Sequence, residues 1–348
     1  MMRTKGNAIL CIALTVLGGW TGFAKADPPM PERGSASTLV DEPADTIRLG
    51  IIGLDTSHVI AFTKIINDPK KKSGCRVTAA FPGGSPDFPS SANRVDGYTR
   101  QLQDKHEVEI VRSIEELCTR VDGILLESLD GRPHLEQARI VIAAGKPLFI
   151  DKPVAHNLSD AIELYRLAKE HNVPCWSSSA YRFGEGIVDA RQNEALGGVV
   201  GCDVYGSSSW AEFHPDLYLY GIHAAEALFT VMGPGCRQVQ RIKTDNGDLV
   251  IGTWNDGRIG TFRDPKQGKA PGLAVIYGSK TSVIAKAPGY DPLVAEIVKF
   301  FKTRKAPVTT EETIEIYAFM SAADESKAKS GAPIALPDLI ERASQRSK

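Results

Sequence analysis

Short apolar segments alternate with helix-like segments between residues 47 and 150, and this alternation restricts the fold more than any other feature of the sequence. The strand-like segments are 47–53, 76–81, 109–111, 123–127 and 147–150. Strands that alternate with helices form right-handed βαβ units and a parallel sheet covered on both faces. We therefore predict a doubly wound α/β domain of the nucleotide-binding type over residues 46–155. Such sheets bind ligands beyond the carboxyl ends of their strands.

The second half of the chain has a different pattern, in which strands dominate. Its strand-like segments are 199–210, 239–243, 249–254, 259–262 and 274–277. The sequence Asn255-Asp256-Gly257 lies between two of them, and Asp-Gly is a strong signal for a hairpin. One long helix is expected over residues 220–231. We predict an α+β domain with a mostly antiparallel open sheet over residues 156–340.

The first 26 residues have the features of an export signal. Arg3 and Lys5 precede an apolar run over residues 8–22, and Ala24-Lys25-Ala26 is a small-x-small cleavage site. The run is short for a membrane span, although a retained anchor helix is the alternative. We expect cleavage after Ala26, a periplasmic or secreted protein with no further membrane contact, and a flexible linker over residues 27–45.

Charge and cysteine content exclude several classes of function. The chain has 41 Lys and Arg against 42 Asp and Glu, a formal net charge of −1, so nothing favours a nucleic acid as partner. Five cysteines remain after the signal and no CxxC occurs, which argues against a zinc site or a disulfide scaffold but leaves one disulfide open. The spacing of His214, Asp216 and His223 matches no metal-ligand signature, so we expect no metal.

Polar side chains follow the predicted strands at the edge where a ligand would bind. Lys152 is an ammonium between an acid and a proline, placed to bond a substrate hydroxyl and stabilise a developing alkoxide. Glu127 and Asp130 offer carboxylates that bind sugar hydroxyls or act as a base. The alternative is that Glu127 pairs with Arg132 or with Lys152.

Six motifs in fixed order carry a resemblance to a known family. They are Gly50-Ile51-Ile52-Gly53, His134-Leu135-Glu136-Gln137-Ala138, Gly145-Lys146-Pro147, Asp151-Lys152-Pro153, Arg182-Phe183 and Gly221-Ile222-His223. From about residue 47 to residue 336 the chain resembles the Gfo/Idh/MocA family of nicotinamide-dependent sugar and inositol dehydrogenases. The resemblance implies a Rossmann domain, a second domain for substrate and oligomer contacts, NAD or NADP as cofactor, a sugar or polyol substrate, and a homo-oligomer.

The dinucleotide loop departs from the pattern of that family. Where the family has GxGxxG, this chain has Gly53-Leu54-Asp55-Thr56-Ser57-His58, so only the first glycine is kept. A carboxylate at Asp55 would repel a pyrophosphate unless it points away as a helix cap, whereas Thr56 and Ser57 have groups that donate to phosphate. Capping and phosphate contact are equally open interpretations of these residues. The candidate cofactor-binding residues are Gly53, Asp55, Thr56, Ser57, His58, Gly83, Ser128, Asp151 and Lys152.

His223 is the expected proton shuttle. The resemblance assigns it this role, and an imidazole with a pKa near neutrality takes a hydroxyl proton as hydride leaves and returns it in the reverse direction. The family commonly has an aspartate four residues earlier, and here that residue is Leu219. Asp216, His214 and Tyr220 are the candidate replacements. The expected catalytic set is Lys152, His223, Tyr220 and Asp216.

The leading hypothesis is an exported NAD(P)-dependent oxidoreductase that acts on a sugar or polyol. Because free dinucleotide is scarce outside the cytoplasm, the second hypothesis is a redox-neutral glycoside lyase or hydrolase that recycles a tightly held cofactor. The third is a sugar-binding relative without activity. The segment Phe81-Pro82-Gly83-Gly84-Ser85-Pro86-Asp87 after the second strand does not decide between NAD and NADP.

Overall fold

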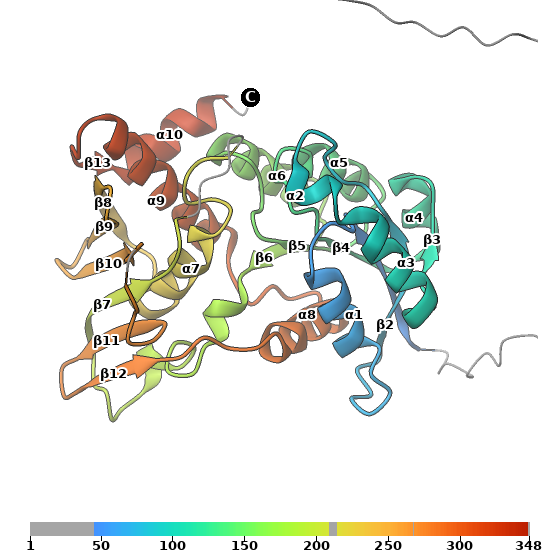
Figure 1. Cartoon of the computed structure of the whole chain (residues 1–348), viewed down its shortest axis with the longest axis horizontal. Coiled ribbons are helices and arrows are strands. Elements are labelled where there is room, and N and C mark those ends of the chain that lie inside the picture. The colour runs from blue at the N-terminus through green and yellow to red at the C-terminus, as the bar shows by residue number, and fades with distance from the viewer. Residues whose placement is uncertain (1–44, 209–213, 267, 347–348) are drawn as a thin grey trace, which may run out of the picture. The chain divides into compact units, whose positions relative to one another are not determined.

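The computed structural model describes residues 45–208, 214–266 and 268–346 (Figure 1). The expected signal segment and nearly all of the expected linker lie outside these residues. Within them, no helix is both long and apolar enough to cross a membrane.

The first sheet is parallel throughout and has the strand order β3-β2-β1-β4-β5-β6. Its strands are β1 (Ile47–Ile52), β2 (Cys75–Phe81), β3 (Glu109–Ile110), β4 (Gly123–Leu126), β5 (Leu148–Asp151) and β6 (Cys175–Ser178). β4 and β5 are buried along their whole length, as expected for strands covered on both faces. The strand order reverses at β1, from which β2 and β3 extend to one side and β4, β5 and β6 to the other, and the switch point between β1 and β4 is where doubly wound sheets bind ligands.

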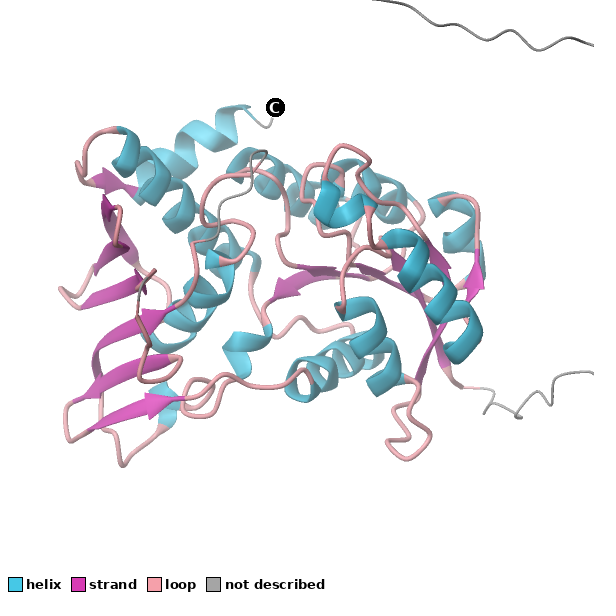
Figure 2. Ribbon diagram, viewed as in Figure 1, coloured by secondary structure: helices cyan, strands magenta, loops and turns pink. Residues whose placement is uncertain are grey.

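Helices cover both faces of the first sheet (Figure 2). They are α1 (His58–Ile66), α2 (Pro89–Ala92), α3 (Val95–His106), α4 (Ile114–Arg120), α5 (His134–Ala143), α6 (Leu158–Glu170) and α8 (Asp291–Thr303). Leu49 and Ile51 of β1 share a core with α1 and α8, whereas Ile52 shares one with α4, α5 and α6. The alternating contacts confirm the doubly wound architecture. The sheet also extends past residue 155 through α6 and β6, into the range assigned above to the second domain.

The second sheet has the order β12-β11-β7-β10-β9-β8-β13 and is mostly antiparallel, with β10 and β7 as a parallel pair. Its strands are β7 (Val199–Tyr205), β8 (Cys236–Thr244), β9 (Gly247–Trp254), β10 (Ile259–Asp264), β11 (Ala274–Gly278), β12 (Ser282–Ala285) and β13 (Ile334–Ala335). The predicted hairpin at Asn255-Asp256-Gly257 joins β9 to β10, and Gly257 has the positive φ of 85° that its turn requires.

One face of the second sheet packs against α7 (Gly221–Met232) and α9 (Thr310–Ala328), and α10 (Leu336–Arg346) packs on α9 and β8. Val200, Ile259 and Ile284 are more than half exposed on their strands. The two sheets are joined through buried contacts. The Val154 amide, just after β5, donates to the hydroxyl of the buried Tyr317 in α9 at 2.5 Å.

The bond between Val154 and Tyr317 generates a stability prediction. In Tyr317→Phe the buried Val154 amide loses its acceptor, so we expect the free energy of unfolding to fall by about 1–3 kcal/mol. Tyr277→Phe is the matched control, because its hydroxyl donates to Asp203 at an exposed position where water replaces the bond. Urea denaturation measures both variants, and an equal loss in the two would contradict the assignment.

Candidate active site

The loops after β1, β2 and β4 meet at the switch point of the first sheet. Gly53 has φ +88°, and a Cβ on it would lie 2.3 Å from the Ser128 hydroxyl oxygen, so only glycine fits. Its amide donates to the Phe81 carbonyl at the end of β2. A Cβ on Gly83 would lie 3.4 Å from the Gly53 Cα. The structure therefore brings together three of the expected cofactor-binding residues, Gly53, Gly83 and Ser128.

Asp55 is fully buried where the loops after β1, β2 and β4 meet. Its Oδ1 accepts from the Leu129 amide at 2.9 Å, and its Oδ2 accepts from the Ser91 hydroxyl at 2.6 Å. Burial raises the pKa of Asp55 and outweighs these two hydrogen bonds. The N-cap residue of α1 is Ser57, whose side chain makes no capping hydrogen bond. Asp55 therefore does not cap the helix, as one interpretation expected. It joins the loop after β1 to Leu129 and Ser91 by hydrogen bonds.

His58 stands where the family has its third glycine, and it pairs with Asp151. Its Nδ1 lies 2.6 Å from Asp151 Oδ2, and its ring packs on Phe62 and Tyr290 with centroid separations of 5.2 and 4.8 Å. Burial alone would raise the pKa of Asp151, but the contact with His58 reverses this and holds the pKa below its usual value. These two candidates therefore fix the start of α1 against the end of β5.

Lys152 follows Asp151 at the carboxyl end of β5 and is 5% exposed. Burial lowers its pKa, against the opposing effect of Asp151. Its Nζ lies 5.6 Å from the centre of the Tyr220 ring, which precedes α7. The ammonium therefore lies between the two sheets, next to the second candidate group of residues.

His223 lies in the first turn of α7, and its partner is Ser179 at the end of β6. The Ser179 Oγ lies 2.6 Å from His223 Nδ1, and the Tyr181 ring lies 4.9 Å from the imidazole. Burial, and next the charge of Lys152, lower the pKa of His223 well below 6.5, so the imidazole is neutral near pH 7. The sequence reasoning missed Ser179, because Trp176-Ser177-Ser178-Ser179 is too polar to suggest a strand end.

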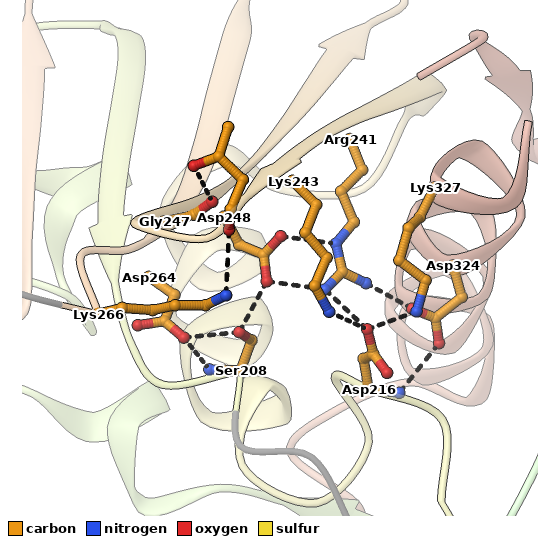
Figure 3. Close-up of polar contacts among 11 residues, drawn as sticks. Ser208, Asp216, Arg241, Lys243, Gly247, Asp248, Asp264, Lys266, Asp324 and Lys327 are labelled. Carbon is orange, nitrogen blue, oxygen red and sulfur yellow. Dashed lines mark hydrogen bonds and ion pairs between the residues drawn. The ribbon is translucent and has the colours of Figure 1, made fainter. Parts of the chain in front are cut away.

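Asp216 is not the partner of His223, which corrects our expectation. Asp216 instead accepts from Arg241, Lys243 and Lys327 at 3.0, 3.2 and 2.6 Å (Figure 3). Arg241 is buried and also bonds Asp248 and Asp324 in this cluster. A buried guanidinium needs such compensation, so the place of Asp216 is explained by stability of the second sheet rather than by proton transfer.

The other two expected partners of His223 also have different contacts. His214 Nε2 lies 3.2 Å from Asp130 Oδ1, and its ring lies 5.5 Å from the Phe88 ring. Tyr220 is 40% exposed, and its recorded ring contact is with Lys152. Of the expected catalytic set, Lys152, His223 and Tyr220 are therefore brought together and Asp216 is not.

Glu127 at the end of β4 is fully buried, and neither of its carboxyl oxygens has a hydrogen-bond partner in the described part of the chain. Of the two alternatives considered for Glu127, a hydrogen-bonded pair with Arg132 or Lys152 is therefore not found in the described part of the chain. Burial, and then the charges of Asp151 and Asp55, raise its pKa well above the usual value. The surroundings of Glu127 therefore favour its protonated form.

A cavity of about 580 Å³ opens next to His223, at the ends of β7 and β10. Its side chains include Tyr181, Tyr205, Tyr220, His223, Asp264, Lys266 and Lys286. Aromatic rings beside hydrogen-bonding groups suit a ligand with many hydroxyls. The cavity therefore places a neutral imidazole and the neighbouring Lys152 beside a space of substrate size.

No cluster of three or more His, Cys, Asp or Glu side chains suited to a metal ion occurs within residues 45–208, 214–266 and 268–346. The same residues contain five cysteines, all with free thiols. Burial raises the pKa of each thiol, so none of the five is a reactive thiolate at neutral pH.

Comparisons with known proteins agree with the geometry. Residues 89–179 match the family model described as oxidoreductase family, NAD-binding Rossmann fold. A probable dehydrogenase from Thermotoga maritima superposes with TM-score 0.67 at 16% identity, over 84% of this chain and 99% of that one. A putative myo-inositol dehydrogenase from Sinorhizobium meliloti gives 0.65 at 15%, over 84% and 100%. No curated protein matches the sequence.

A further neighbour is the scyllo-inositol dehydrogenase from Lactobacillus casei, solved with NAD(H) and scyllo-inositol, with TM-score 0.64 and 14% identity over 84% of this chain and 99% of that one. The fold and the matched segment define the class, which is that of oxidoreductases with an NAD-binding Rossmann domain. The matched model is that of the Gfo/Idh/MocA family, which agrees with the resemblance that the sequence motifs indicated. The expected enzyme and cofactor classes are thereby confirmed.

The backbone before α1 suits a nicotinamide dinucleotide, whereas one side chain at the switch point does not. Gly53 and Gly83 pack on Ser128 and on each other, which brings the loops after β1, β2 and β4 together at the edge of the sheet where such a cofactor would bind. Within the described residues, the amides of Thr56 and Ser57 before α1 have no hydrogen-bond partner, so they remain available to phosphate oxygens. The exception is Asp55, whose carboxylate lies between the β1 and β4 loops.

Ser179 acts as a positioning residue for His223, which yields a prediction. In Ser179→Ala the imidazole loses the hydrogen bond between its Nδ1 and the Ser179 hydroxyl, which fixes the orientation of the ring. We therefore expect kcat to fall about 10- to 100-fold with a smaller change in KM. Because the pKa of His223 lies below 6.5, wild-type activity should persist as pH falls through 6.5 and drop only below it. Steady-state kinetics across pH measure both effects.

Ser179→Thr is the conservative control, since it keeps the hydroxyl. Recovery of kcat in Ser179→Thr, together with an altered acid limb in Ser179→Ala, is the expected pattern. An unchanged kcat and pH profile in Ser179→Ala would show that His223 does not depend on this bond.

Proposed function

We propose that this chain is an NAD(P)-dependent oxidoreductase that oxidises a secondary hydroxyl of a sugar or polyol. The observation that carries the proposal is that Tyr220 and His223 line one cavity and that the Lys152 Nζ lies 5.6 Å from the centre of the Tyr220 ring. The neighbouring structures named for myo-inositol and scyllo-inositol dehydrogenases support a polyol as the substrate class. Export before folding, with cleavage after Ala26, and a homo-oligomeric assembly are parts of the same proposal.

Lys152 has two tasks in this mechanism. Its ammonium donates a hydrogen bond to the substrate oxygen and stabilises the negative charge that develops there as the C–H bond breaks. The lowered pKa reduces the cost of sharing its proton with that oxygen. The nicotinamide ring supplies the hydride acceptor when the cofactor is bound.

His223 holds and moves the hydroxyl proton. When its Nδ1–H donates to Ser179 Oγ, the Nε2 lone pair is free to accept the proton from the substrate hydroxyl. The imidazole is neutral before the reaction, as this step requires, because its pKa is well below 6.5. Tyr181 and Tyr220 beside it pack against the apolar face of a sugar ring.

A second candidate is a redox-neutral lyase or hydrolase that retains its cofactor. It is favoured by the export signal expected at the N-terminus and by the buried Glu127, whose raised pKa suits an additional proton donor near Asp151. Turnover that proceeds without added NAD(P) would support this candidate, and turnover that needs stoichiometric NAD(P) would support the dehydrogenase.

The test of the proposed function is Lys152→Ala, assayed with inositols and sugars by nicotinamide absorbance. We expect kcat/KM to fall about 100- to 1,000-fold, because the alkoxide loses its main stabilising charge, while dinucleotide binding changes only a few-fold. Lys105→Ala, at an exposed position on α3, is the charge-matched control and should behave as wild type. A protein that binds sugar without turnover, unaffected by Lys152→Ala, would instead be a binding protein.

A further inference from the structure

We propose that the Asp55 carboxylate holds the place of the cofactor's pyrophosphate, and that Asp55 is therefore the residue that limits dinucleotide affinity in this chain. The identity of the ligand rests on the proposed function. The location of the ligand follows from the topology, because β1 and β4 are neighbours at the switch point and the loops after them form the ligand crevice. Asp55 belongs to the first loop and bonds the second.

The hydrogen bonds of Asp55 are those that a bound anion would make. Oδ1 takes the Leu129 amide, and Oδ2 takes the Ser91 hydroxyl. The Ser91 oxygen already accepts from the Ser85 amide at 2.8 Å, so its own proton is directed to Asp55. Donors from the β2 and β4 loops are thus directed at one buried carboxylate.

The buried acids around Asp55 oppose the binding of another anion. Asp55, Glu127 and Asp151 are buried acids close enough to act on one another, at the ends of neighbouring strands. A pyrophosphate brings two further negative charges, and like charges in a poorly hydrated site repel strongly. The carboxylate and the pyrophosphate therefore compete for the same donors.

Side chains of the loops after β2 and β4 also hold these loops in place. Phe88, Leu129 and Leu219 form a small buried cluster of their own. Arg132 holds the adjoining loops by bridging Asp130 and Asp87. A dinucleotide consequently has to separate Asp55 from Leu129 and Ser91 before it can seat, and this step lowers its apparent affinity.

The experiment is a calorimetric titration of the mature chain with NAD, for wild type, Asp55→Gly and Asp55→Asn. Asp55→Gly restores the second glycine of the family loop, and we expect its Kd to be at least about 10-fold lower than that of wild type. Asp55→Asn keeps a side chain that bonds Ser91 but removes the charge, so its affinity for NAD should rise by a smaller factor. This variant also tests the inference if Asp55→Gly does not fold. Asp122→Asn is the control, because it removes a charge at the other end of β4, just before Gly123.

The outcomes separate this inference from the proposed function. Tighter binding in both Asp55 variants, with Asp122→Asn unchanged, supports the inference. Wild-type binding that neither Asp55 variant improves overturns it and leaves the proposed function standing, because Asp55 is then only a structural tie. If neither wild type nor the folded Asp55 variants bind NAD at millimolar concentration, both the inference and the proposed function fail.

Discussion

The compensation of buried charge at the carboxyl edge of the first sheet is the constraint on which the site depends. Parallel strands bring the ends of β1, β4 and β5 to one place, and in this chain each end carries an acid, namely Asp55, Glu127 and Asp151. Each acid is accommodated differently. Asp55 accepts two hydrogen bonds, Asp151 pairs with His58, and Glu127, which has no such partner, has a raised pKa. The lowered pKa of Lys152 and of His223 follows from the same exclusion of water.

The two halves of the site differ in physical character. At the crevice of the first sheet, Asp55 is fully buried and accepts hydrogen bonds from Leu129 and Ser91. The cavity beside the second sheet is open, and it presents tyrosines and His223 to a ligand. Lys152, at the end of β5, lies next to Tyr220, which lines this cavity, so it is the link between the two halves of the site.

Much of this fold could be predicted from the sequence, because a strand covered on both faces must be continuously apolar and its glycines mark the turns. That reasoning located β1, β4 and β5, the hairpin at Gly257, and the positions of Gly53 and Lys152. It failed where polar residues form a buried strand, as in β6, and therefore missed Ser179. It also misplaced Asp216, whose partners Arg241 and Lys327 lie 25 and 111 residues away in the chain. Such long-range ion pairs leave no local pattern to recognise.

The most direct test of the account is a crystal structure of the mature chain grown with NAD and a polyol. The account predicts the pyrophosphate at the Leu129 amide and the Ser91 hydroxyl, with Asp55 displaced from both. It also predicts the nicotinamide next to Lys152 and the polyol in the cavity beside His223. A dinucleotide bound elsewhere, or a crevice still closed by Asp55 while the polyol occupies a different place, would contradict it.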